Sequence, residues 1–200
     1  MEMTVSKIHA ASEQIDAAIN LLAENKFPVS VHTLSAAAYE VAEDLCKHGK
    51  VFSIGDAFII HLKDSALKGF LRGLAAPANF FKHADRDPNE VIFFNTEKND
   101  LMIFMATMNL AEIQQTTSLT RRVFLNWFAM KKPEAFEADI WEAFSDPHGA
   151  KLLSQWAQNA PREAMLAFLR AMLLAANGNN EECTALSFRL HEEYGLPLKE

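Results

Sequence analysis

Apolar residues recur at intervals of three and four along nearly the whole chain, which is the spacing of one face of an α-helix. The first such run is Ile8, Ala11, Ile15, Ile19 and Leu22. It predicts an amphipathic helix that ends before the Phe27-Pro28 pair, because proline disfavours helical backbone in the residue before it.

A second run of the same spacing is Val31, Leu34, Ala38, Val41 and Leu45. It predicts a helix with Ser30 as its N-cap and His48-Gly49 at its end, where glycine suits the left-handed position after a helix. Three successive alanines at 36–38 leave room for close approach of a neighbouring helix, in the same chain or in another.

The pattern is less regular between residues 51 and 95. Asp56 is placed to cap a helix over 57–74, and Pro77 suits the first turn of a short following helix that ends near Asp87-Pro88. The only strand-like run is VIFF at 91–94, which is too short to indicate a sheet.

A long helix is predicted from Glu97 to about Thr116, with residues 101–105 apolar on nearly every side, as in a central buried helix. Further helices follow, beginning at Ser118 or Thr120 and separated by breaks at Pro133, Asp146-Pro147 and 177–180. We therefore expect an all-α bundle of eight or nine helices. It divides into an N-terminal bundle over 1–117 and C-terminal helices over 118–200 packed on it, or forms one domain.

Composition narrows the functional classes. Half of the 200 residues are apolar, which suits a globular protein with a full core, and the net charge of −7 argues against a broad nucleic-acid-binding surface. The two cysteines, Cys46 and Cys183, lie outside any metal-binding spacing and fit a reducing cytosol. The N-terminus has no signal-peptide pattern and no run reaches the roughly 18 apolar residues of a membrane span. We expect a cytoplasmic protein without a membrane partner and without a cofactor.

The densest group of polar side chains is in ANFFKHADRDPNE at 78–90. On a helix, Asn79 and His83 share one face and are candidate catalytic residues, since such a pair could position a phosphate or transfer a proton. Lys82 and Arg86 share another face and are candidate binding residues. In the alternative interpretation, which we favour, Asp85 and Asp87 pair with these two cations and the stretch is a solvated helix end.

Two other sites are weighed against structural interpretations. His83, Asp85 and Asp87 form an HxDxD pattern that could hold a metal, but alternate residues of a helix point to different sides, so no metal is expected. His32 and Tyr39 share a helix face and could line a pocket opposite His83, or form a polar stripe at a helix contact.

The stretches VHTLSAAAYEVAEDL (31–45) and ANFFKHADRDP (78–88) resemble a family of small, uncharacterised bacterial proteins, over roughly the first 130 residues. More distantly, the chain is similar to the HEPN fold, a helical bundle of ribonucleases, toxins and nucleotidyltransferase partners. Asn79 and His83 match the polar residue and the histidine of the HEPN motif, whereas its arginine position falls on Ala78. The resemblance implies a homodimer in which two His83 side chains face each other.

Three hypotheses follow. The first, which we favour, is a dimeric non-enzymatic, regulatory or interaction protein, in which 78–88 is structural or binds a partner protein. The second is a HEPN-like protein that acts on RNA or a nucleotide through Asn79 and His83, as a ribonuclease-like hydrolase or in phosphotransfer. The third is a small-molecule-binding bundle with a pocket lined by His32, Tyr39 and His83. Burial of His83 separates the first hypothesis from the second.

Overall fold

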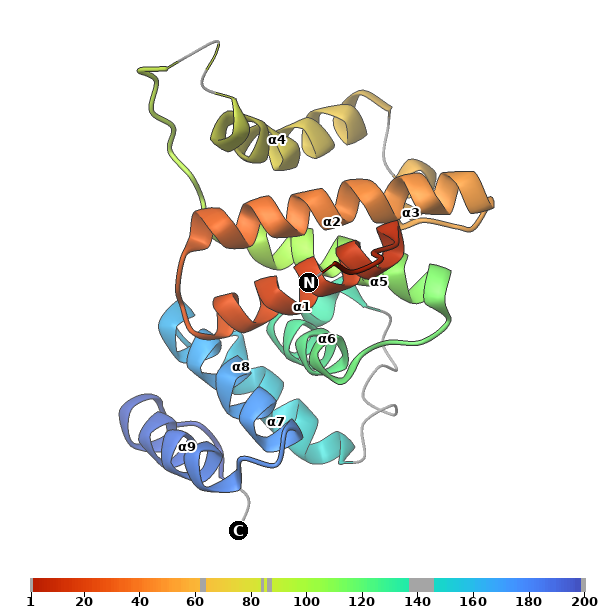
Figure 1. Cartoon of the computed structure of the whole chain (residues 1–200). Coiled ribbons are helices and arrows are strands. Elements are labelled where there is room, and N and C mark those ends of the chain that lie inside the picture. The colour runs from red at the N-terminus through yellow and green to blue at the C-terminus, as the bar shows by residue number, and fades with distance from the viewer. Residues whose placement is uncertain (1, 62–63, 84, 86–87, 137–145, 199–200) are drawn as a thin grey trace. The chain divides into compact units, whose positions relative to one another are not determined.

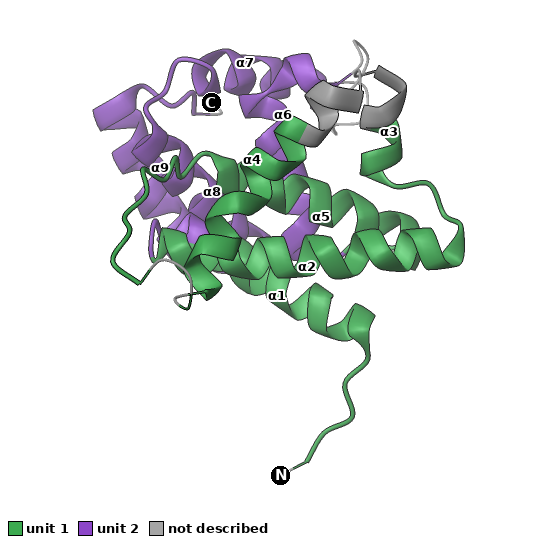
Figure 2. Cartoon of the chain, turned by 90° about the horizontal axis from the view of Figure 1, so that it is seen from above, with its two compact units in different colours: residues 1–21, 27–117 green, residues 22–26, 118–200 purple. Residues whose placement is uncertain are grey.

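The computed structural model describes residues 2–61, 64–83, 85, 88–136 and 146–198, with side chains for all of these except 58–61 and 64–68. These residues form nine α-helices, one 3-10 turn and no strand, which confirms the predicted all-α bundle (Figure 1). Contacts divide the chain into two compact units (Figure 2). Unit 1 contains residues 1–21 and 27–117, and unit 2 contains residues 22–26 and 118–200. None of the described helices combines the length and apolarity needed to cross a bilayer.

Unit 1 is built around two long helices, α2 (Pro28–Gly49) and α5 (Lys98–Gln114), which pack along each other. The apolar centre of α5 is buried as predicted, with Ile103, Met105 and Leu110 fully inaccessible. Most of α1 (Lys7–Ala23) also belongs to this unit, and Ser12 on α1 accepts a hydrogen bond from Gln114 at 3.1 Å.

The alanine-rich segment of α2 is used inside the chain. Ala36, Ala38 and Ala42 are at most 1% exposed, whereas Ala37 is half-buried. The close approach that these small side chains permit is therefore used within a single copy of the protein.

The start of α2 differs from the prediction. Pro28 is the first helical residue, preceded by Phe27 in the left-handed region with φ of 50°, and Ser30 lies inside the first turn without a capping role. Proline is favoured at this position because its φ is already helical and its missing N–H has no intrahelical partner to lose. At the other end Gly49 is still helical, and Lys50 takes the left-handed C-cap conformation.

The region 51–95 also departs from the prediction, because it contains α3 (Ile54–His61) and α4 (Asp64–Lys82). Asp56 accepts from the backbone N–H of Ser53 at 2.9 Å while the Ser53 hydroxyl accepts from Asp56 N–H at 3.1 Å, a reciprocal cap at the start of α3. The predicted short helix beginning at Pro77 was wrong, since Pro77 lies inside α4. Residues 91–94 form no strand.

Unit 2 contains α6 (Leu119–Lys131), the 3-10 turn η1 (Pro133–Ala135), α7 (Pro147–Ala157), α8 (Arg162–Ala176) and α9 (Asn180–Tyr194). Most of the segment between the predicted breaks at Pro133 and Asp146-Pro147, where a further helix was expected, lies outside the described residues. Two indoles join the helices: buried Trp127 donates to the Met165 carbonyl and half-buried Trp156 to the Tyr194 carbonyl, each at 2.7 Å.

Candidate functional site

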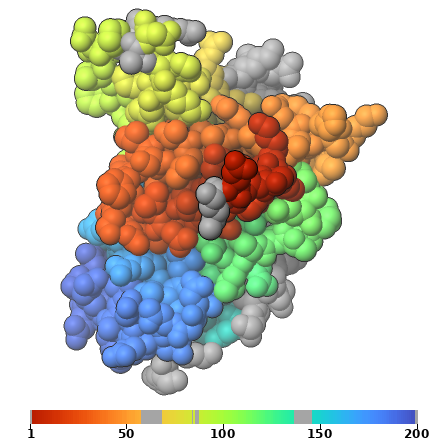
Figure 3. All heavy atoms as spheres, viewed as in Figure 1, coloured from red at the N-terminus to blue at the C-terminus, as the bar shows by residue number. Residues whose placement is uncertain are grey.

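A groove of about 680 Å³ lies on the outer side of α4 in unit 1. Its walls are the second half of α4, the side chains of Ile92 and Phe93, and Lys98 at the start of α5. Figure 3 shows this part of the chain at the surface in yellow-green. We call this feature the α4 groove.

The second half of α4 and the residue that follows it supply three polar side chains of the groove. Arg72 and Asn79 are seven residues apart, which places them on one face of α4, and His83 comes directly after Lys82, the last residue of the helix. Lys98 adds a second permanent positive charge from α5, and Phe80 and Phe93 add aromatic surface. The α4 groove therefore combines cationic, amide, imidazole and aromatic groups.

Pro77 explains how α4 is attached to the rest of unit 1. Proline has no N–H, so the carbonyl of Gly73, four residues earlier, loses its helical partner. The Lys98 ammonium donates to that carbonyl at 2.9 Å. The next carbonyl, that of Leu74, lies 3.0 Å from Nε2 of His32 on α2.

His32 is fully buried and each of its ring nitrogens faces an oxygen. Nε2 faces the Leu74 carbonyl, and Nδ1 lies 3.0 Å from Oδ1 of Asn99. The Asn99 amide donates from Nδ2 to the Pro28 carbonyl at 3.0 Å, and this bond sets its orientation. Only an imidazolium could donate at both nitrogens. Burial nevertheless lowers the pKa of His32, against the effect of the two hydrogen bonds, so the neutral ring leaves one contact without a proton.

Aromatic rings surround His32 and hold the loop that follows α4. The ring centroid of Phe94 is 5.0 Å from that of His32 and 5.4 Å from that of Phe81, both in edge-to-face arrangements. This cluster fixes residue 94 beside the last turn of α4 and so positions Ile92 and Phe93 at the groove. His32 thus supports the site from beneath, without lining it.

Tyr39 borders a different space, an enclosed apolar cavity of about 100 Å³ between α2, α4 and α5. Burial, followed by the charge of Glu43 and a hydrogen bond to it, raises the pKa of the Tyr39 phenol, so it stays protonated at neutral pH. Neither His32 nor His83 lines this cavity. The structure therefore does not bring His32, Tyr39 and His83 around one pocket.

The HEPN-type pair is at the surface. Asn79 is exposed, and the His83 side chain is 57% exposed with Nδ1 3.9 Å from Oδ1 of Asp85. Ala78, at the motif's arginine position, is completely buried. Lys82 is exposed but does not line the α4 groove, and the candidates Arg86 and Asp87 lie outside the described residues. Among the residues that are described, no three acidic, histidine or cysteine side chains are grouped to hold a metal.

Sequence reasoning missed Arg72, Lys98 and Phe93. The spacing of Arg72 from Asn79 and His83 was a usable signal, but it has meaning only if the helix continues through Pro77. Lys98 and Phe93 are far along the chain from Arg72, and no local pattern relates them. Comparison with protein-family models, with curated proteins and with solved structures finds no match for this chain. The chemistry of the site has to be inferred from its own side chains.

Proposed function

We propose that the α4 groove binds a nucleotide, a ligand that carries both a phosphate and a planar ring. The observation that supports this proposal is the lining of one groove by Arg72, Lys98 and an exposed Phe93. Guanidinium and ammonium groups are the usual partners of phosphate, and aromatic faces stack on bases of any sequence.

The size and charge of the site favour a small ligand. A volume of about 680 Å³ is within the usual range for small-molecule sites. A net charge of −7 works against a long nucleic acid, whose binding needs many basic contacts along the strand. Asn79 offers both a donor and an acceptor to a base edge or a ribose. The proposal takes the absence of catalysis from the first of the three hypotheses and the nucleotide ligand from the second.

Chemical-shift mapping of amide resonances during titration with adenosine monophosphate, adenosine and inorganic phosphate tests the proposal. We expect the nucleotide to shift resonances along α4 and residues 92–98, and to bind about tenfold more tightly than adenosine or phosphate alone, because only it engages both parts of the groove. Arg72→Gln should weaken nucleotide binding about tenfold, the loss of one charge-assisted hydrogen bond. Arg122→Gln is the matched control, because Arg122 is an exposed helical arginine in unit 2. Absence of shifts at millimolar nucleotide, or equal effects of the two variants, contradicts the proposal.

A second candidate function is cleavage of a phosphodiester with His83 as a general acid or base. It is supported by the exposure of His83 in the groove and by the nearby Asp85 carboxylate. Incubation of total RNA with the wild-type protein, His83→Ala and Arg72→Gln distinguishes it from binding alone. Cleavage lost in His83→Ala but binding retained indicates catalysis, whereas no cleavage by the folded wild type leaves a binding protein.

A further inference from the structure

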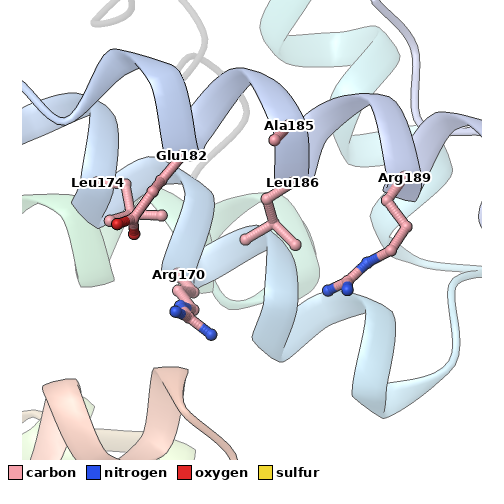
Figure 4. A pocket seen from close by; sticks show the side chains of 6 residues that line it. All are labelled: Arg170, Leu174, Glu182, Ala185, Leu186 and Arg189. Carbon is pink, nitrogen blue, oxygen red and sulfur yellow. The ribbon is translucent and has the colours of Figure 1, made fainter.

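A second groove lies between α8 and α9 in unit 2, with a volume of about 350 Å³. We call it the α9 groove; its lining residues are Arg170, Leu174, Glu182, Ala185, Leu186 and Arg189. Figure 4 shows Glu182 near the start of α9, Arg189 further along the same helix, and Ala185 and Leu186 between them.

Along α9, the two charged residues of the groove lie on either side of its two apolar residues. Glu182 and Arg189 are seven residues apart, two helical turns, so they lie on one stripe of the helix about 10 Å from each other. At that separation they do not pair with each other, and neither forms an ion pair with another described residue. The midpoint between them falls between Ala185 and Leu186.

This order makes the surface self-complementary. If α9 of a second copy lies antiparallel across the groove, with the two-fold axis at Ala185 and Leu186, each Glu182 faces Arg189 of the other copy. The same patch then serves both copies, as a two-fold symmetric interface requires. Ala185 has only a methyl group near the axis, so the two helices can approach closely.

Apolar surface accompanies the charges. Leu174 and Leu186 form the floor of the α9 groove. An apolar floor between charged side chains is typical of an interface with an apolar centre and a polar rim.

We propose that the α9 groove is a homodimer interface in which α9 packs antiparallel against α9 of a second copy. A second copy fits better than an acidic peptide of another protein, because a uniformly acidic segment would face Arg189 but repel Glu182. The proposal does not depend on nucleotide binding. It also differs from the dimer that the HEPN resemblance implies, because the two-fold axis lies on unit 2 and not at His83.

Sedimentation velocity over a concentration series, with charge-reversal variants, tests the interface. The wild type should show a monomer–dimer equilibrium. Arg189→Glu and Glu182→Arg should each raise the dimer dissociation constant at least about tenfold, because each reversal places like charges together twice per dimer. The double variant Glu182→Arg with Arg189→Glu should restore the wild-type constant, since the opposite charges face each other again. A mixture of the two single variants should form heterodimers.

Glu181→Arg is the matched control. Glu181 is an exposed acid in the same first turn of α9, so its reversal removes the same favourable helix-dipole interaction, but it does not line the groove. It should leave the dissociation constant unchanged, as should His83→Ala. A wild type that stays monomeric at the highest concentration, a double variant that does not recover, or a Glu181→Arg variant that weakens the dimer equally overturns the proposal.

Discussion

Two buried asparagines on α5, Asn99 and Asn109, each join helices of unit 1 through hydrogen bonds. The two hydrogen-bond networks differ in how many of their groups find a partner. Each asparagine is at most 1% exposed, and each pairs with a titratable residue of α2, His32 for Asn99 and Glu43 for Asn109. The partner elements differ. The Asn109 network holds the start of α3, whereas the Asn99 network holds α4 and its groove.

At Asn109 each contact of the side chain joins a donor to an acceptor. The amide donates to Oε2 of Glu43 at 2.9 Å and its oxygen accepts from the N–H of Ile54 at 2.8 Å, while Ser53 donates to Oε1 of Glu43 at 3.2 Å. Gly55 leaves the space for this carboxylate, because a Cβ there would lie 2.7 Å from Oε1 of Glu43.

At Asn99 the donors and acceptors do not balance when His32 is neutral. One of its two nitrogens then faces an oxygen without a proton between them. An enclosed apolar cavity of about 100 Å³ also lies beneath α4. The helix that lines the α4 groove is therefore held by the less complete hydrogen-bond network. We expect α4 to be released from the rest of unit 1 more easily than α3.

The largest effect should come from truncating the asparagines. Asn109→Ala leaves the Glu43 carboxylate and the Ile54 N–H without their partner, and we expect it to lower the free energy of unfolding by about 3 kcal/mol. Asn99→Ala should cost about 1 kcal/mol, because neutral His32 can still donate to Leu74. Urea denaturation of both variants measures the difference. Equal losses would show that the two networks are equally complete.

A smaller effect is expected from adding one methyl group to a glycine. Gly55→Ala should destabilise the protein by about 2 kcal/mol, because the Glu43 carboxylate it meets is held by Ser53 and Asn109 and cannot move freely. Gly69→Ala is the control on α4, where an added Cβ has no atom within 4 Å. It should stabilise the protein by about 1 kcal/mol through helix propensity. Thermal unfolding of the two variants should shift in opposite directions, and a shared direction contradicts the packing argument at Gly55.

The smallest effect concerns pH. Because the pKa of His32 is lowered in the folded protein, mainly by burial, the unfolded chain binds the proton more readily. Stability should therefore be unaffected by His32 above the usual histidine pKa of about 6.5 and should fall as the pH decreases below it, by at most about 1.4 kcal/mol per pH unit.

His32→Gln should remove this part of the pH dependence, measured by urea denaturation between pH 7.5 and 5. His48→Gln, at an exposed histidine of the same helix, should retain it. If the wild type instead gains stability on acidification relative to His32→Gln, the two facing oxygens outweigh burial and His32 is buried as an imidazolium.

Much of the fold could be predicted from the local sequence. The three-and-four spacing predicted α1 and α2, and the apolar run at 101–105 predicted the buried α5. Ser118 was one of the two residues expected to begin α6. Its hydroxyl accepts from the N–H of Arg121 at 3.2 Å. These features depend on residues within one or two turns of each other, so the pattern along the chain is sufficient to predict them.

The course of α4 was decided only by the tertiary structure. Locally, Pro77 indicates a helix start, because a proline within a helix leaves a carbonyl without a partner. In the folded protein Lys98, 25 residues after Gly73, donates to the Gly73 carbonyl, and His32, 42 residues before Leu74, binds the neighbouring carbonyl. The helix can then continue through Pro77, so that Arg72 and Asn79 share one face of it and line the same groove as His83. The candidate residues Asn79 and His83 came from the sequence. The groove that joins them to Arg72, Lys98 and Phe93 exists because the distant side chain of Lys98 replaces a hydrogen bond that proline cannot make.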